Sequence, residues 1–420
     1  MRIKSLALAL GATFAVTTAL ATGAHAQTVK VFVGGQERPE VMRELFAKFM
    51  AANPGVKIDL ETGGATSELQ QKYLNTVLSA GDTTLDVFLI DIIRPAQYAS
   101  AGWIESLDKY LGADRDKIMG QYLPAYKQAN MVDNKVVALP AFADAMFLYY
   151  RKDLLAKYKL AAPKTWDELA TVARTIQAGE KNPELQGISF QGKAIEGAVC
   201  TFLLPYWSQG GELVTNGKLT LDKPKAEAGL AMWRKLVDQG VAKKNIAEVA
   251  TDDTRKEFQA GNVLFAVNWG YAWNHFQDGA DSSVKDKVGV VSLPAMAGGK
   301  PASCIGGWQW AVSSFSKNKE ASAKLVRWLS SPEVSKQLAL KASNLPVYPS
   351  VYQDKEVLAV NGWFADALPV VQSARSRPVT PRYSEVSEAV RVNTNAVMAG
   401  VKTPAAAVSE IENRVKRILR

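Results

Sequence analysis

The chain has 420 residues, with 50 lysine and arginine side chains against 41 acids, ten tryptophans, two histidines and two cysteines. Its formal charge of +9 is in the range of nucleic-acid binders, but the cations are dispersed among acids, as in Lys285-Asp286-Lys287. Because a nucleic-acid binder gathers its cations in a patch, we expect no nucleic-acid partner. The few histidines and cysteines exclude a multi-histidine or cysteine-based metal site, so we expect no metal and no cofactor.

The N-terminus has the pattern of a secretory signal peptide. Arg2 and Lys4 precede an uncharged apolar run, and Ala24-His25-Ala26 is a small-residue cleavage site. Cleavage after Ala26 leaves 394 residues, with 48 cationic and 41 acidic side chains and a charge of +7. No later apolar run reaches the ~18 residues that span a bilayer, and no cysteine follows the cleavage site as a lipid anchor requires. We therefore expect a soluble, monomeric periplasmic protein of about two domains.

In chain order, strand and helix patterns alternate. We predict strands at residues 29–34, 56–60 and 85–90, with helices over 41–50 and 67–80 between them. Further helices are predicted over 165–178, 196–208, 225–239, 253–260, 320–329, 332–341 and 405–419, and further strands over 263–268, 287–293 and 310–313. The alternation predicts an α/β fold with mainly parallel sheets flanked by helices.

Polar side chains follow each of the first three predicted strands. Gln36 and Glu37 come after the first, Glu61 and Thr62 after the second, and Asp91 after the third. Ligands of open α/β sheets bind beyond the carboxyl ends of the strands, so we expect these side chains to meet at one cleft. The alternative is that they cap helices or face solvent. Asp91 is the strongest candidate, because it lies in an apolar run where an unpaired acid is costly to bury.

Two segments place tryptophan beside glycine. Asn268-Trp269-Gly270-Tyr271 follows a predicted strand, and Gly306-Gly307-Trp308 precedes one. Indole rings stack on the apolar C–H faces of sugars while acids and amides bond the hydroxyl groups. We interpret Trp269 and Trp308 as ligand platforms in loops. The tryptophans within helical patterns are interpreted as core residues: Trp103, Trp233 and Trp328.

The sequence contains few matches to catalytic motifs, and those matches are incomplete. There is no P-loop, the S-x-x-K match at residues 314–317 lacks its companion motifs, and His275 has no spaced partner and is expected on a helix surface. Asp91 and Asp144 form an acid/base pair only in a remote alternative, an exported carbohydrate-active enzyme. We expect a protein that is not an enzyme.

Short motifs follow one another in a fixed order along residues 29–419. They include Leu85-Asp86-Val87 with Asp91, Leu139-Pro140-Ala141-Phe142-Ala143-Asp144, Pro163-Lys164-Thr165-Trp166, Glu196-Gly197, Gly306-Gly307-Trp308, Ser331-Pro332-Glu333, and Arg377-Pro378 with Tyr383. This order resembles the extracellular solute-binding proteins of carbohydrate ABC importers, the family of maltose- and trehalose/maltose-binding proteins.

The resemblance implies a two-lobed periplasmic binding protein fold whose lobes close on a ligand by hinge motion. It implies a three-segment hinge near residues 143–146, 305–311 and 343–347. The N-terminal lobe would comprise residues 27–143 plus 308–344, and the C-terminal lobe residues 144–307 plus 345–420.

The resemblance also implies the ligand residues, which are Glu37, Asp91, Asp144, Trp269, Gly307, Trp308 and Arg382, with Gln36, Thr66 and Tyr271 near them. It implies a receptor that delivers a di- or oligosaccharide to inner-membrane permease subunits, with trehalose, maltose or sucrose as first choice. Trehalose/maltose binders often carry tyrosine where Phe142 stands, which leaves the sugar open. A polyol, a uronic oligosaccharide or a glycerol phosphate is the alternative, although the acids of the cleft oppose an anion.

Cys200 and Cys304 are the only cysteines. In an oxidising compartment they form either a disulfide that anchors the Trp308 segment or two buried free thiols.

Overall fold

Eight of the described strands form one mixed sheet that runs through both lobes. The computed structural model describes residues 27–34, 38–64 and 66–420, so the predicted signal peptide, Gln36 and Glu37 lie outside the described residues. Within these residues the strand order is β2-β1-β3-β12-β6-β10-β7, and β11 also pairs with β6. The strands of this sheet are β1 (Gln27–Gly34), β2 (Val56–Gly63), β3 (Val87–Asp91), β6 (Leu139–Arg151), β7 (Gln186–Ser189), β10 (Val263–Trp269), β11 (Val288–Val291) and β12 (Ile305–Val312).

Parallel pairs lie at the two ends of the sheet and antiparallel pairs at its middle. β1 pairs in parallel with β2 and β3, and β10 pairs in parallel with β7. β12 is antiparallel to both β3 and β6, and β6 is antiparallel to β10 and β11. Two small hairpins stand apart from this sheet: β4 (Met131–Val132) with β5 (Lys135–Val136), and β8 (Val214–Thr215) with β9 (Lys218–Leu219).

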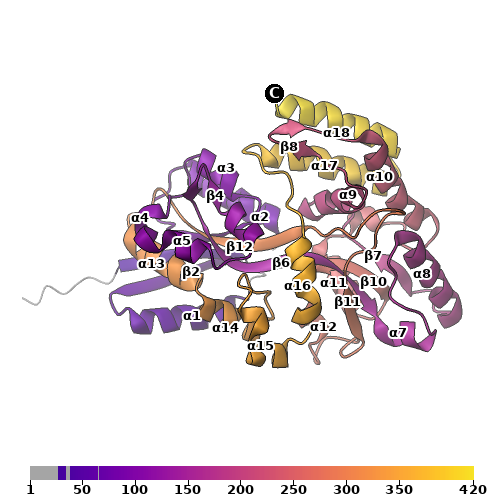
Figure 1. The fold of residues 1–420 in the computed structure, drawn as a ribbon, viewed down its shortest axis with the longest axis horizontal. Coiled ribbons are helices and arrows are strands. Elements are labelled where there is room, and N and C mark those ends of the chain that lie inside the picture. The colour runs from indigo at the N-terminus through magenta and orange to yellow at the C-terminus, as the bar shows by residue number, and fades with distance from the viewer. Residues whose placement is uncertain (1–26, 35–37, 65) are drawn as a thin grey trace, which may run out of the picture.

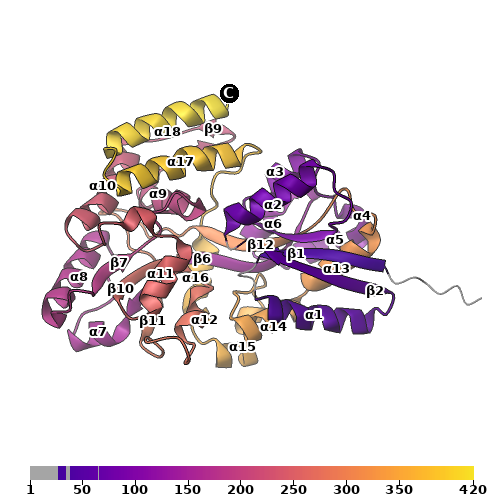
Figure 2. The same ribbon diagram turned by 180° about the vertical axis from the view of Figure 1, so that it is seen from behind.

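Helices divide the molecule into two lobes (Figure 1). In the first lobe, α1, α13 and α14 cover one face of β1–β3, and α2 and α3 lie on the other face (Figure 2). The helices of this lobe are α1 (Pro39–Ala52), α2 (Ser67–Ser79), α3 (Pro95–Ser100), α4 (Asp108–Leu111), α5 (Arg115–Met119), α6 (Pro124–Ala129), α13 (Lys319–Leu329) and α14 (Pro332–Ala342).

The second lobe surrounds β7, β10 and β11. Its helices are α7 (Lys152–Lys157), α8 (Trp166–Glu180), α9 (Glu196–Ser208), α10 (Lys223–Asp238), α11 (Thr251–Gln259), α12 (Ala272–Phe276), α17 (Tyr383–Met398) and α18 (Pro404–Ile418). Two helices lie beside the strands that join the lobes: α15 (Lys355–Val360), which packs on α14, and α16 (Phe364–Ser373), which packs on β6 and β11. β1 begins in the first lobe and the chain ends in the second (Figure 1).

Side-chain alternation along the strands builds three apolar cores. In β1, Val29, Val31 and Val33 enter one core, while Phe32 points to the opposite face and another core. In β6, Phe147 and Tyr149 enter the first of these cores, while Met146 and Leu148 enter a third, beneath α8, α9, α10, α17 and α18. The core that contains Val31 also contains Phe258 and Phe276, so it continues from one lobe into the other.

The joining segments lie side by side. β6 and β12 pair from Ile305 opposite Ala145 to Trp310 opposite Leu139. Ala143 also forms a bridge with Leu345, the third place where the chain passes between the lobes. The hydroxyl of Tyr126, in α6, accepts from the backbone N–H of Asp144 at 2.9 Å and lies 2.9 Å from the carbonyls of Asp144 and Gly306. The residue boundaries of the two lobes stay a prediction.

Most predicted helices and strands are present within a few residues of their predicted bounds, and the exceptions concern the middle of the sheet. β12 begins at Ile305 rather than residue 310, because Gly306 and Gly307 pair with β6 as strand residues. Trp308 therefore lies in a strand, as does Trp269 at the end of β10, and the predicted loop positions of both are wrong. The thirteen-residue strand β6 and the helices α16 and α17 were not among the predicted elements.

Candidate functional site

A cavity of about 770 Å³, including its part open to solvent, lies between the two lobes at the ends of β3 and β10 and against β12. The first lobe contributes Thr66, Ser67, Glu68 and Asp91 to its wall. The joining strands contribute Asp144, Gly306, Gly307 and Trp308. The second lobe contributes chiefly Glu196, Thr251, Asp252, Trp269 and Tyr271, and Arg377 reaches it from the segment before α17. The described wall thus has five carboxylates and one cation.

Arg377 joins acids from both lobes. Its Nη2 lies 3.1 Å from Oδ1 of Asp91 at the end of β3, and its Nη1 lies 3.0 Å from Oε1 of Glu196 at the start of α9. The arginine side chain is 1 % exposed, and the two acids are 12 % and 7 % exposed. Burial alone would lower the pKa of Arg377, but the charges of Asp91 and Glu196 raise it above its ordinary value. The guanidinium therefore stays charged and holds both carboxylates in place.

The two acids of this triad have further partners. Asp91 accepts from the Ser67 hydroxyl at 2.9 Å. Glu196 accepts from the hydroxyls of Tyr383 and Ser387, the latter at 2.7 Å. The carboxylate of Glu68, in α2, accepts from the backbone N–H of Glu196, where a negative charge suits the N-terminus of a long helix. Nε of Arg377 is buried and has no hydrogen-bond partner among the described residues.

Asp144 lies in β6 at the point where the lobes join. Its Oδ1 accepts from the backbone N–H groups of Gly270 at 2.6 Å and Ala145 at 2.7 Å. Burial raises the pKa of Asp144 to about 7, and the backbone donors offset part of that rise. Asp144 is 9 % exposed and lines the cavity. The carboxyl group of Asp144 therefore lies at the cavity and also bonds the backbone where the lobes join.

Two tryptophans form apolar walls of the cavity. Trp269 ends β10, and its carbonyl accepts from the Tyr149 hydroxyl at 3.0 Å. Its ring lies against Gly306, where an added Cβ would come within 2.7 Å of the indole. Trp308 lies in β12 opposite Asp91, directly after Gly307, whose φ of 115° is unfavourable for other residues. Gly306 thus lets the backbone approach the Trp269 indole, and Gly307 lets it approach the Phe142 carbonyl and the Tyr126 ring.

Tyr271 and Thr66 lie at the cavity as well. The Tyr271 hydroxyl lies 3.2 Å from the carboxylate of Asp252, and Thr66 caps α2 by accepting from the Leu69 N–H. A second, smaller cavity shares Asp144, Tyr271 and Trp308 with the first and continues toward Arg38, His275 and Asn344. His275 lies on α12, is half-buried and lines this cavity, and burial, with Arg255 and Arg38, lowers its pKa.

Two sequence assignments require correction. Arg382 does not line either cavity, because its side chain is 53 % exposed and pairs with Glu385 and the carbonyl of Ile418. The arginine of the cavity is Arg377. Glu61 does not reach the cavity either, because it pairs with Lys30 of the neighbouring strand at 2.8 Å. Gln36 and Glu37 lie outside the described residues, so their assignment stays a prediction.

The sequence interpretation missed Arg377, Glu196 and Glu68 as members of one site. The signal that could have found this site is Arg377, because the segment around Ser376 and Pro378 contains no acid that could pair with it. A buried Asp91 requires a cation, and a local partner for Arg377 is lacking in the sequence.

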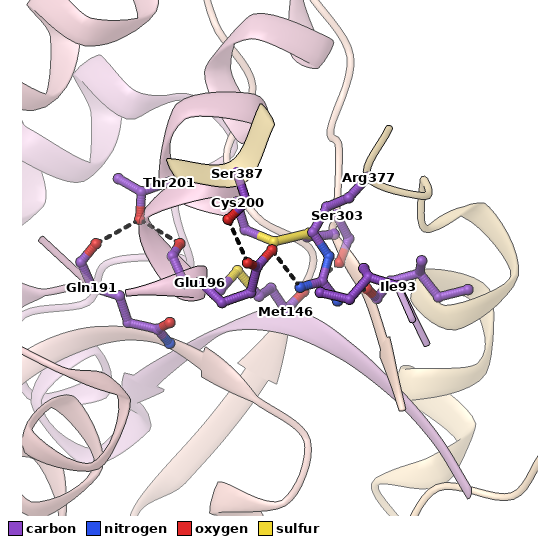
Figure 3. Close-up of a disulfide and its surroundings, with 12 residues drawn as sticks. Ile93, Met146, Gln191, Glu196, Cys200, Thr201, Ser303, Arg377 and Ser387 are labelled. Atoms are coloured by element: carbon purple, nitrogen blue, oxygen red, sulfur yellow. Dashed lines mark hydrogen bonds and ion pairs between the residues drawn. A yellow bond between two sulfur atoms is a disulfide. The ribbon is translucent and has the colours of Figure 1, made fainter. Parts of the chain in front are cut away.

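Cys200 and Cys304 form a disulfide bond beneath this site (Figure 3). Both residues are buried, Cys200 in α9 and Cys304 directly before β12. No group of histidine, cysteine or acidic side chains among the described residues is arranged to hold a metal ion. No helix in the described part of the chain has the length and apolar character to cross a membrane.

Two lobes joined by paired strands, with a polar and aromatic cavity between them, define a ligand-binding protein of the two-lobed class. Residues 34–336 match the family described as bacterial extracellular solute-binding protein. A probable ABC transporter-binding protein of Deinococcus radiodurans is 36 % identical over 99 % of both chains. The chain belongs to the bacterial extracellular solute-binding protein family.

Solved structures agree with this assignment. Maltose-bound MalE3 of T. maritima is 33 % identical, with a TM-score of 0.86 over 93 % of this chain and all of that one. A solute-binding protein of Agrobacterium vitis S4 with bound D-mannitol is 25 % identical, with a TM-score of 0.78 over 93 % of this chain and 98 % of that one. The protein is thus a solute-binding receptor of an ABC transporter, and these two solved relatives hold maltose and D-mannitol.

Proposed function

We propose that this chain is an exported periplasmic receptor for a neutral di- or oligosaccharide, with an α-glucoside such as maltose, trehalose or sucrose as first choice. In this proposal the signal peptide is cleaved after Ala26, and the lobes, residues 27–143 plus 308–344 and 144–307 plus 345–420, close on the sugar. The monomeric receptor then delivers the sugar unchanged to inner-membrane permease subunits.

The observation that carries the proposal is the pairing of Asp91 and Asp144 with Trp269 and Trp308 in one cavity wall. Carboxylates accept hydrogen bonds from sugar hydroxyls, and indole faces cover the apolar C–H faces of the rings. The resemblance to maltose-bound MalE3 supports an α-glucoside.

The charge of the wall opposes an anionic ligand. Four carboxylates, and Asp144 with its pKa of about 7, face one arginine, which already pairs with Asp91 and Glu196. A uronic oligosaccharide or a glycerol phosphate would meet net repulsion there. A neutral polyol is the second candidate, because its hydroxyls suit the same acids and the mannitol-bound neighbour shares the fold.

Calorimetric titration with maltose, trehalose, sucrose and mannitol tests this proposal. We expect saturable binding of one disaccharide that also raises the melting temperature. A Trp269→Ala variant should bind at least ~10-fold more weakly, consistent with the loss of one stacking face, whereas Trp233→Phe, in the core, serves as the matched control. Binding of mannitol alone would select the polyol candidate, and no binding of any of the four would refute the proposal. Intact sugar after prolonged incubation distinguishes the receptor from the enzyme alternative.

A further inference from the structure

We propose that the Cys200–Cys304 disulfide is a positioning element of the ligand site, so that ligand affinity depends on this bond and not only on the fold. The inference rests on the proposed function, because the affinity in question is that for a sugar in the cavity between the lobes. It concerns one cluster of segments, shown in Figure 3, that meets directly beneath the cavity.

The first half of the cluster is the N-terminal turn of α9. Glu196 and Gly197 line the cavity, and Cys200 lies one helical turn after Glu196 on the same helix. A bond at Cys200 therefore restrains the position of the Glu196 carboxylate along the helix axis. In Figure 3 the side chains of Glu196, Cys200 and Arg377 lie next to one another, with Ser387 donating to Glu196 at 2.7 Å.

The second half is the segment that enters β12. Cys304 directly precedes Ile305, and Gly306, Gly307 and Trp308 of the same strand line the cavity. The bond at Cys304 is thus two residues away from Gly306, against whose backbone Trp269 packs.

A third segment, which carries Arg377, is attached to Cys304 through the backbone. Arg375 donates its N–H to the Ser303 carbonyl at 2.8 Å, and Ile305 donates to the Arg375 carbonyl at 3.0 Å. Nη2 of Arg377 lies 3.3 Å from the Ile305 carbonyl. The residues that flank Cys304 therefore set where the guanidinium lies.

The disulfide closes this arrangement between segments 104 residues apart. Glu196, on α9, and Arg377, beside Cys304, form an ion pair across it at 3.0 Å. Without the bond, α9 and the β12 entry are still packed in the core, but their relative position has no covalent limit. Binding groups require placement within about 0.5 Å, so a small shift of α9 weakens binding without unfolding the protein.

The test compares the oxidised protein with a Cys200→Ala/Cys304→Ala variant and with reduced wild type. Reduction by dithiothreitol transfers two electrons and two protons to the disulfide, which becomes two thiols while the reagent becomes a cyclic disulfide; mass spectrometry counts the thiols. The probe is whichever of maltose, trehalose, sucrose or mannitol binds the oxidised protein most tightly. We expect Kd to rise at least ~10-fold in the folded variant and in the folded reduced protein, and to recover on reoxidation.

Val199→Ala is the matched control, since it removes apolar atoms from the adjacent buried position of α9 and keeps the disulfide. It should lower the melting temperature but leave Kd within about twofold, since the bond that positions the site is intact. An unchanged Kd in folded protein without the bond would overturn the inference.

A ligand-free measurement separates failure of this inference from failure of the proposed function. Hydrogen exchange of the amides in residues 195–201 should be faster in the reduced protein than in the oxidised one, relative to the amides of α18. Should the oxidised protein bind none of the four probes, the proposed function fails, and the exchange comparison still decides whether the bond restrains α9. Equal exchange in both forms would overturn the inference.

Discussion

The two lobes meet in two different ways. At one place the joining strands connect them, and at another, which we call the front, α17 meets α2 and α3 through side chains. At the joining strands the contact is backbone pairing between β6 and β12 and an apolar core that continues through both lobes. At the front it is made by polar side chains. The hydroxyl of Ser384, in α17, lies 2.7 Å from the amide of Gln71 and 2.9 Å from both Arg94 and Gln97.

This difference indicates which contacts between the lobes are harder to separate. Backbone pairing and a continuous core cannot separate without exposing apolar surface and unpaired peptide groups to water. A side-chain hydrogen bond contributes a net of about 1 kcal/mol, since water replaces it when it breaks. The front contacts are therefore the separable ones, and Arg377, which lies between the two regions, contributes to both.

The largest effect is expected at Arg377. Arg377→Met leaves Asp91 and Glu196 buried without their shared cation, so the free energy of unfolding should fall by about 3–5 kcal/mol. Sugar affinity should fall at least ~100-fold, because each 1.4 kcal/mol lost in the bound form is tenfold in Kd. Denaturant titration and calorimetry measure the two effects. Arg382→Met is the control, since an exposed side chain outside the cavity should change stability by less than ~0.5 kcal/mol. Equal losses in the two variants would contradict this role of Arg377.

The next effect is a pH dependence from Asp144. Because burial raises its pKa to about 7, the folded protein keeps a proton that the unfolded chain has released above about pH 4. The contribution of Asp144 to the free energy of unfolding is fully present below about pH 4. It is lost as the pH rises to about 7, at up to ~1.4 kcal/mol per pH unit. The difference in unfolding free energy between wild type and Asp144→Asn should follow this slope and level off above pH 7. A difference that does not vary with pH would show that Asp144 is ionised throughout.

A smaller effect is expected where the strands join. Tyr126→Phe leaves the buried backbone N–H of Asp144 without its hydroxyl partner, which should cost about 1–3 kcal/mol of stability. We also expect a change of Kd, because Asp144 lines the cavity. Tyr122→Phe is matched, since it loses a buried bond to the Ser330 carbonyl away from the cavity and should change stability alone. A change of Kd in both variants would indicate a general loosening of the first lobe.

The smallest effect is expected at the front. Ser384→Ala removes the hydroxyl shared by three side chains across the lobes, so Kd should rise about two- to tenfold with little change in melting temperature. Small-angle scattering of the ligand-free variant should show a larger radius of gyration than wild type. Ser373→Ala, which loses a bond within α16, should change neither quantity. An unchanged scattering profile would mean that the Ser384 contacts do not hold the lobes together.

Patterns within one element were readable from the sequence, and contacts between distant elements were not. β1, α1 and β10 have clear apolar periodicity, and Asp91, Trp269 and Trp308 were predicted site residues that the structure brings together. β6 was missed because its first eleven residues are all buried and show no alternation. Arg377 and Arg382 are five residues apart with the same chemistry, and only their tertiary partners distinguish them. The pairing of Cys200 with Cys304 likewise depends on where α9 lies against β12.

The first described strand and the last helix belong to different lobes, β1 to the first and α18 to the second (Figure 1). A fluorescent donor attached ahead of Gln27 and an acceptor attached after Arg420 would each move with one lobe. Energy transfer between the two dyes would then report movement of one lobe against the other with no change in the cavity.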